Sequence, residues 1–191
     1  MLEHLIEWDQ AAFGLINGTW HNDFLDVILP YWRNKKTWIP LYALLLLIIG
    51  KDRGFKTVWV LIIIGLTIGL SDQVSSQWIK KTIERIRPCN DTNLGAVREL
   101  VPCGGGYSFT SSHATNHFAF AMQLFLLFRL NWQKRYFVLL FFWAGLIAYS
   151  QVYVGVHYPL DVTMGAILGC FLAWIVYWAT AWLGIIKKIW S

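Results

Sequence analysis

The run TVWVLIIIGLTIGLSDQVSSQWI, residues 57–79, decides the fold class of this chain. A helix of about 20 mostly apolar residues is long enough to cross the hydrocarbon core of a bilayer. This run nevertheless carries a carboxylate, and at helical spacing Asp72, Ser76 and Lys80 share one stripe. Because ionisable groups are costly in lipid and usually functional there, we expect this stripe to face the interior of a helical bundle.

The composition of the whole chain agrees with a membrane protein. Hydrophobic residues make up 57% of the sequence and charged residues 14%, whereas soluble domains carry roughly 25% charged residues. The 12 Trp indicate aromatic belts at the membrane interfaces. The net charge of +5 comes from short basic clusters between apolar runs, which are typical orientation signals and do not indicate nucleic-acid binding. We predict an all-α integral membrane protein that forms one domain, residues 1–191, with the bilayer as its partner; the sequence leaves the oligomeric state open.

Five transmembrane helices are predicted after an N-terminal interfacial region. Residues 1–37 mix acidic and apolar residues and are interrupted by Gly18 and Pro30, which favours amphipathic helices on the membrane surface. They lack the pattern of a cleaved signal peptide, so we expect the N-terminus to be retained. The transmembrane core is residues 38–191. The apolar run of its first helix is shorter than the roughly 20 residues of a usual span, so the helix must include flanking residues and its ends are not fixed by the sequence. The expected spans are residues 38–50, 57–79, 113–130, 136–152 and 159–188.

The basic clusters predict the orientation of these spans. Threading the chain through five spans places one set of cations together: Lys51, Arg53, Lys56, Lys134, Arg135, Lys187 and Lys188. By the positive-inside rule that side is cytoplasmic and includes the C-terminus. The loops 80–113 and 150–161 then meet on the outer face, which is the periplasmic face if the membrane is a bacterial inner membrane. The same threading leaves Arg33, Lys35 and Lys36 outside, against the rule.

Three polar segments carry residues suited to phosphate chemistry. Lys80 and Arg87 are seven apart, on nearly the same face of a predicted helix closed by Pro88, and such a pair can grip a phosphate. A basic collar at the membrane interface is the alternative for this segment. Three glycines at 104–106 precede a polar run that ends at His113 and opens a helix, whose first N–H groups suit an anion. The alternative there is an ordinary helix with a serine N-cap.

The third segment holds His157 and Asp161. Pro159 disfavours helical geometry at Tyr158, so His157 lies just outside a helix whose first turn carries Asp161. The carboxylate can then hold one imidazole nitrogen and leave the other as a nucleophile. A lone interfacial histidine is otherwise a passive hydrogen-bonding residue, but His113 and the upstream cations favour phosphoryl transfer.

These segments resemble the three signatures of the type-2 phosphatidic acid phosphatases, KxxxxxxRP, PSGH and SRxxxxxHxxxD. That family shares its fold with vanadium haloperoxidases and glucose-6-phosphatase. The resemblance covers roughly residues 70–170. The matching residues are Lys80, Arg87 and Pro88 in the first signature, Ser111 and His113 in the second, and Ser150, His157 and Asp161 in the third. Ser112 replaces the glycine of the second signature, and Gln151 stands where the third has a phosphate-binding arginine.

The resemblance implies a membrane lipid phosphatase that needs no metal or other cofactor. His157 would attack phosphorus to form a phosphohistidine, Asp161 would orient it, and His113 would protonate the leaving oxygen and then activate water. The substrate would be a phosphomonoester or pyrophosphate of a lipid, of the isoprenyl pyrophosphate, phosphatidylglycerol phosphate, phosphatidic acid or lipid A type. The residues expected to hold the phosphoryl group are Lys80, Arg87, the Ser111 hydroxyl, the Ser112 N–H and Gln151, with Arg85 or Arg98 as substitutes for the missing arginine.

Two other functions are open at this level. His113 and His117 are four apart and could join His157 and Asp161 around zinc, as in a metal-dependent hydrolase. A non-catalytic lipid-phosphate binder or transporter is favoured by the missing arginine and by the intramembrane Asp72.

The three cysteines divide between two environments. Cys89 and Cys103 lie in the long polar loop and are candidates for a disulfide if that loop faces an oxidising compartment. Cys170 lies in an apolar run and is expected to pack as a small hydrophobe.

Overall fold

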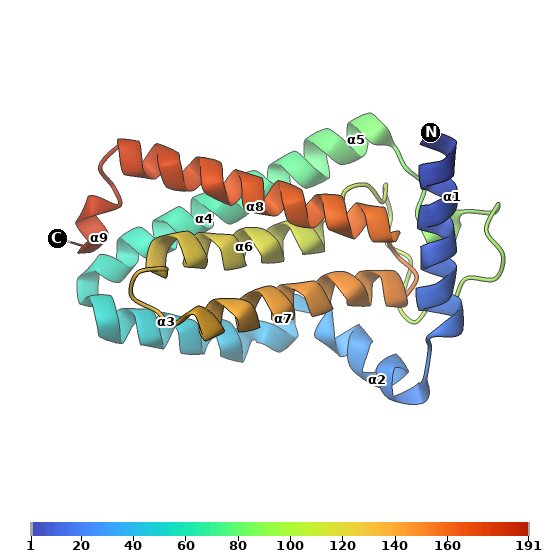
Figure 1. Ribbon diagram of the computed structural model, residues 1–191, viewed down its shortest axis with the longest axis horizontal. Helices are drawn as coiled ribbons and strands as arrows, with labels where there is room; N and C mark the ends of the chain where they lie inside the picture. The colour runs from blue at the N-terminus through green and yellow to red at the C-terminus, as the bar shows by residue number, and fades with distance from the viewer. Residues whose placement is uncertain (1, 191) are drawn as a thin grey trace.

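Long helices lying side by side form the body of the protein (Figure 1). The computed structural model describes residues 2–190, and within that range it contains helices and loops but no β-strand. The prediction of an all-α protein is therefore confirmed. Met1 and Ser191, the outermost residues of the predicted segments, lie outside the described residues. The body consists of α3 (Ile39–Arg53), α4 (Thr57–Gln73), α6 (Ser112–Phe128), α7 (Lys134–Tyr153) and α8 (Pro159–Trp182).

Three segments of the described chain are long and apolar enough to cross a membrane. They are Lys35–Asn90, Lys134–Tyr153 and Pro159–Trp182. The first contains both α3 and α4, between which the chain reverses direction (Figure 1). The reversal lies at Gly54, whose φ of 55° is a left-handed conformation that glycine adopts without a steric penalty. The protein is thus an integral membrane protein, as predicted.

Two predicted helices end earlier than expected. After α4 the chain continues as a π-helix, η4 (Val74–Ile79), and a short α5 (Lys80–Ile83), which stops at Glu84 with φ 53°. A left-handed residue ends a helix, and Arg87 beyond it is extended. The prediction that Lys80 and Arg87 share a helical face was wrong for this reason.

The last predicted helix is also two helices. It ends at Trp182, the chain turns at Gly184 with φ 73°, and α9 (Lys187–Trp190) follows. A positive φ is a conformation that an α-helix cannot continue through, so the basic residues at 187 and 188 lie in a separate element.

The N-terminal region lies at one end of the bundle, as interfacial helices would. α1 (Leu2–Phe13) crosses that end, and α2 (Asp23–Trp32) lies beside it (Figure 1). A π-helix, η1 (Gly14–Thr19), follows α1, and a 3₁₀ turn, η2 (Lys35–Trp38), leads from α2 into α3. Asp9, Phe13 and Asn17 are buried, because one face of this region packs on the bundle.

Two glycines let α6 and α8 approach closely. A Cβ on Gly165 would lie 2.8 Å from the carbonyl oxygen of Ser111, and one on Gly169 would overlap the carbonyl of Thr115. This small-xxx-small spacing is a common way for membrane helices to pack. The N–H of Ser111 also donates to the carbonyl of Asp161 at 3.0 Å. The start of α6 and the start of α8 are therefore held together, and both carry predicted site residues.

The long polar loop between α5 and α6 folds over this junction. It contains a short 3₁₀ turn, η5 (Pro88–Asn90), and the predicted disulfide between Cys89 and Cys103, whose Cα atoms are 6.0 Å apart. The loop also packs on the turn before α8: a Cβ on Gly155, which has φ 90°, would lie 2.7 Å from the carbonyl oxygen of Arg98. The remaining cysteine, Cys170, is half-buried and unpaired, as expected.

Candidate active site

Residues from distant parts of the sequence line one cavity of about 540 Å³. His113 comes from the first turn of α6 and His157 from the turn before α8. Lys80 from α5 and Arg87 from the loop line the same cavity, as do the three glycines at 104–106. The structure thus brings together two histidines and two cations that are up to 77 residues apart, the separation of Lys80 from His157.

His157 lies between a carboxylate and a cation. It is almost completely buried, and its Nδ1 is 3.4 Å from Oδ2 of Asp161. That contact is within ion-pair distance but is too poorly aligned for a good hydrogen bond. Nε2 points the other way, 3.5 Å from Nη1 of Arg87. The nitrogen that faces Arg87 is therefore the one that an anion held by the cations would meet.

The surroundings of His157 keep its ring neutral. Burial, reinforced by the positive charges of Lys80 and Arg87 and opposed by Asp161, lowers the pKa of His157 to about 4. Removing an imidazolium from water is unfavourable, and nearby cations add to that cost. At neutral pH the ring keeps the free lone pair that a nucleophile requires.

Asp161 belongs to a buried network that sequence reasoning missed. Its Oδ1 accepts a hydrogen bond from Nη1 of Arg85 at 2.8 Å, and Nη2 of Arg85 donates to Asp9 at 2.6 Å. Asp9 also accepts from the N–H of Leu160 at 2.7 Å. A usable signal in the sequence was the spacing of Asp9 and Phe13, which are four apart on one helical face and are both buried.

The two predicted phosphate-binding cations are held by neutral partners. Nζ of Lys80 donates to the carbonyl of Tyr107 at 3.0 Å. Arg87 donates to the carbonyls of Gly106 at 3.2 Å and Val156 at 3.3 Å. Carbonyl oxygens orient these groups without cancelling their charge, so an anion in the cavity would meet two positive charges.

The two serines before His113 have different environments. Ser111 is the N-cap of α6: it is fully buried, and its Oγ accepts from the N–H of Ala114 at 3.5 Å. Ser112 lines the cavity, and its Oγ forms hydrogen bonds with Ser75 at 3.2 Å and Ser76 at 2.8 Å. Ser111 thus caps the helix, as the alternative prediction for this segment had it. The Ser112 side chain lines the cavity.

Gln151 lies behind the cavity, which differs from the expectation that it holds phosphate directly. It is fully buried in the last turn of α7, and its Oε1 accepts from Nε and Nη2 of Arg33 at 3.3 and 3.1 Å. Arg33 itself lines the wall of the cavity, whereas Gln151 does not. The predicted substitutes for the missing arginine are engaged elsewhere, because Arg85 bridges two aspartates and Arg98 pairs with Asp26.

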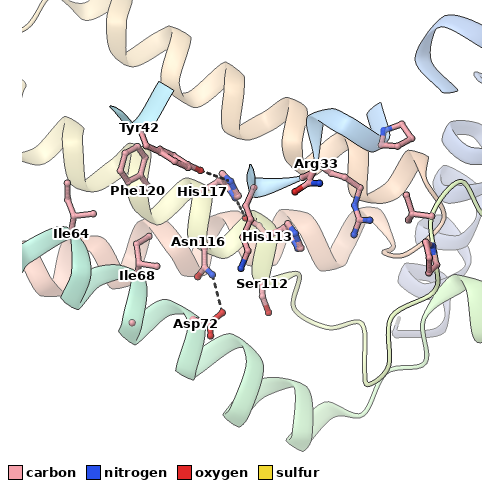
Figure 2. A pocket seen from close by; sticks show the side chains of 16 residues that line it. Arg33, Tyr42, Ile64, Ile68, Asp72, Ser112, His113, Asn116, His117 and Phe120 are labelled. Atoms are coloured by element: carbon pink, nitrogen blue, oxygen red, sulfur yellow. Dashed lines mark hydrogen bonds between the residues drawn. The ribbon is translucent and has the colours of Figure 1, made fainter. Parts of the chain in front are cut away.

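A second cavity, of about 940 Å³, adjoins the first and shares Arg33, Ser112 and His113 with it. Figure 2 shows its side chains, with His113 and Arg33 near one another. Its wall includes an apolar part formed by Ile64, Ile68 and Phe120. It also includes Asp72, whose carboxylate accepts a hydrogen bond from Asn116 at 3.1 Å. The predicted stripe of Asp72, Ser76 and Lys80 therefore lines the two cavities in succession.

His117, the residue proposed to complete a zinc site, is used within the helix bundle. Its Nδ1 lies 2.7 Å from the carbonyl of His113, and its Nε2 lies 3.3 Å from the hydroxyl of Tyr42 (Figure 2). In the part of the chain that the structure describes, no group of three or more His, Cys, Asp or Glu side chains is arranged to hold a metal ion.

Comparisons with known proteins identify the relatives of this chain. A family model described as the PAP2 superfamily matches residues 56–185. The chain is 35% identical over 183 residues to the lipid A 4'-phosphatase of Bacteroides thetaiotaomicron, which covers 93% of this chain and 79% of that protein. It is 32% identical over 185 residues to the undecaprenyl-diphosphatase of Sulfolobus acidocaldarius, with 97% and 79% covered. The crystal structure of Aquifex aeolicus LpxE superimposes with a TM-score of 0.65 at 27% identity, over 87% of this chain and 92% of that one.

Membrane-embedded helices around two histidines and a set of cations, together with these relatives, define an integral membrane phosphatase that acts on lipid phosphates. The chain belongs to the PAP2 superfamily, whose model matches residues 56–185. The family resemblance of the three signatures is thereby confirmed.

Proposed function

We propose that this protein removes phosphate from a lipid through a phosphohistidine on His157, without a metal ion. The observation that carries the proposal is that His113 and His157 line one cavity with Lys80 and Arg87. Nε2 of His157 attacks phosphorus while the bond from phosphorus to the lipid oxygen breaks. Water then attacks the phosphohistidine, releasing inorganic phosphate and restoring the imidazole.

The other residues have separate roles in these two steps. His113 protonates the departing lipid oxygen in the first step and takes a proton from water in the second. Asp161 faces Nδ1 of His157 and stabilises the positive charge that develops on the ring. Lys80 and Arg87 stabilise the charge on the phosphoryl oxygens, which is the main contribution a protein makes to phosphoryl transfer.

The larger cavity supports a lipid with a bulky, hydroxylated headgroup. Asp72 can accept hydrogen bonds from hydroxyl groups, and the apolar wall near Phe120 suits an acyl chain. Among the substrates considered, lipid A 4'-phosphate fits this description best, and one relative is named a lipid A 4'-phosphatase. Undecaprenyl diphosphate is the alternative, since another relative is named for it.

The arrangement of the helices supports a single domain with five spans: α3, α4 with η4, α6, α7 and α8. Basic residues meet at the end of the bundle away from the cavities: Arg53 stacks on Trp190, and Lys188 stacks on Trp59. By the positive-inside rule that end, with the C-terminus, is cytoplasmic. The site then faces the outside, which is the periplasm in a bacterial inner membrane.

Phosphate release from purified full-length protein tests this proposal. Vesicles would carry lipid A 4'-phosphate, undecaprenyl diphosphate, phosphatidylglycerol phosphate or phosphatidic acid, each with and without EDTA. We expect release that survives EDTA, is fastest with lipid A 4'-phosphate, and falls about 10³-fold or more in His157→Asn, as expected for loss of a nucleophile.

Two outcomes would contradict the proposal. Undiminished release by His157→Asn would rule out the phosphohistidine, and release abolished by EDTA would favour the metal-dependent alternative. Lipid movement across vesicles without phosphate release, retained in His157→Asn, would identify a transporter.

A further inference from the structure

We propose that Arg33 binds the phosphoryl group in place of the arginine that the family signature has at position 151, and that Gln151 positions it. This inference rests on the proposed function and adds a residue to its site. Arg33 lies outside all three signatures and precedes Gln151 by 118 residues.

The backbone places Arg33 at the edge of the site. Arg33 follows α2 directly, and its N–H closes the last turn by donating to the carbonyl of Leu29 at 3.1 Å. Leu29 is buried in one cluster with Tyr153 and Val154, at the end of α7. Packing of α2 against α7 therefore brings the residue after α2 close to the last turn of α7, where Gln151 lies.

The side chain of Arg33 extends from this anchor into the cavities. It lines both of them, together with Ser112 and His113, and Figure 2 shows it beside His113. A guanidinium has five N–H donors. Nε and Nη2 each donate to Gln151, which leaves Nη1 and the second hydrogen of Nη2 without a hydrogen-bond partner among the described residues, in a side chain that lines both cavities.

The charge of Arg33 has no carboxylate to balance it. Among residues 2–190 no Asp or Glu lies within ion-pair distance of it, whereas Arg85 and Arg98 are both paired with aspartates. Burial and the positive charge of Arg87 lower the pKa of Arg33, so the site holds two neighbouring cations at a cost. A phosphate dianion would remove that cost by interacting with both.

Gln151 has the chemistry of a positioning residue. An arginine at 151 would put a second guanidinium against Arg33 in a buried place, which is strongly unfavourable. A glutamine instead offers a neutral acceptor, and its Oε1 receives two N–H groups of Arg33. With glutamine at position 151, the site still has a third cation beside Lys80 and Arg87. That cation is Arg33, which follows α2, instead of an arginine in α7.

A charge-swap experiment tests this inference. Purified full-length variants would be assayed for phosphate release from lipid A 4'-phosphate and, as a probe of the site itself, for inhibition by orthovanadate. We expect Arg33→Gln to lower kcat/KM about 10- to 100-fold and to weaken vanadate inhibition about tenfold or more, which is the range for loss of a charged hydrogen bond. Lys36→Gln removes an exposed cation three residues away and is the matched control, with both quantities unchanged.

The double variant Arg33→Gln/Gln151→Arg restores the family arrangement. We expect it to recover vanadate inhibition to within about threefold of the wild type, a rescue that a merely structural role for either residue would not produce. Gln151→Ala should weaken vanadate inhibition several-fold, because Arg33 loses its anchor. If Arg33→Gln does not fold, Arg33→Lys keeps the charge without the fork and should weaken inhibition several-fold.

The failures of the two proposals are distinguishable. Wild-type protein that releases no phosphate from any lipid would end the proposed function. Active wild-type protein with unchanged kcat/KM and vanadate inhibition in Arg33→Gln, or in Arg33→Lys if only that variant folds, would overturn the role of Arg33 alone.

Discussion

At the scale of single residues, the two nitrogens of His157 meet opposite environments. Nδ1 faces Asp161, and Nε2 faces Arg87. The ring is buried, so neither face is screened by bulk water, and electrostatic effects on it are stronger than at a surface. In the proposed mechanism the carboxylate would stabilise the positive charge of the phosphohistidine, and the cations, which disfavour protonation of the free ring, would bind the phosphate.

The titration of His157 should therefore differ from that of an ordinary histidine. Its pKa is lowered from the usual 6.5 to about 4, so the folded protein keeps the ring neutral at pH 5, whereas the unfolded chain protonates it. Because the unfolded state binds more protons between pH 6.5 and 4, the stability linked to this group is present above that window and decreases as pH falls through it. NMR of ¹⁵N-labelled histidines, with His157→Asn to assign the signal, measures this. A midpoint near 6.5 would contradict it.

At the scale of secondary-structure elements, the contact between α6 and α8 sets the distance between the two halves of the site. Gly165 and Gly169 remove the side chains that would separate the helices. The same contact aligns the first turn of α6, with His113, beside the first turn of α8, with Asp161. The two glycines thus fix how far His113 lies from Asp161, in addition to packing α8 against α6.

Adding one methyl group at this contact should destabilise the protein. The Cβ in Gly169→Ala would overlap the backbone of α6, and such overpacking costs about 1–3 kcal/mol. Gly145→Ala is the matched control in α7, because nothing lies within 4 Å of its added Cβ; there the change should be neutral or stabilising by up to about 1 kcal/mol. Unfolding by SDS in mixed micelles measures both, and equal effects would contradict the close approach.

The loop between α5 and α6 depends on its disulfide. The bond between Cys89 and Cys103 closes a short loop, for which chain-entropy arguments give about 3 kcal/mol of stabilisation. Arg87 and the three glycines of the cavity wall flank this disulfide-closed ring on either side, within the same connection between α5 and α6. We expect Cys89→Ser/Cys103→Ser to be less stable and to release phosphate more slowly. Reductant should slow the wild type and leave the variant unchanged, and an insensitive wild type would count against this role.

At the scale of the whole molecule, the N-terminal helices are part of the site although the family model matches only residues 56–185. α1 contributes Asp9, which reaches Asp161 through Arg85. α2 is followed by Arg33, which lines both cavities. Helices expected to lie on the membrane surface therefore close one end of the bundle and contact the candidate site.

Removing the ion pair between Asp9 in α1 and Arg85 should lower activity, although Asp9 does not line the cavity. Asp9→Asn removes the charge that pairs with Arg85, so Arg85 and Asp161 lose part of their orientation. We expect kcat to fall about tenfold and the unfolding free energy to drop by about 1–3 kcal/mol, as for a partly buried ion pair broken on one side. Glu7→Gln, an exposed acid on the same helix, is the control and should change neither. Equal behaviour of the two variants would contradict the coupling.

The predictable part of the site is the part with strong local signals. Lys80, Arg87, His113, His157 and Asp161 stand out because ionisable residues are rare in an apolar chain. The ends of α5 and α8 were mispredicted because Glu84 adopts a positive φ that is rare for a residue other than glycine, and because Gly184, a residue type that commonly ends helices, stops α8 before the basic pair.

Hydrophobic pattern and residue type alone determined that this is a helical membrane protein with phosphate chemistry, because both properties follow from local composition and short spacing. Tertiary structure alone decided which cations complete the site. Arg33 and Arg85 have no local signature, and their roles depend on which side chain lies opposite each of them once distant helices pack. The same is true of Gln151, whose purpose is visible only with Arg33 beside it.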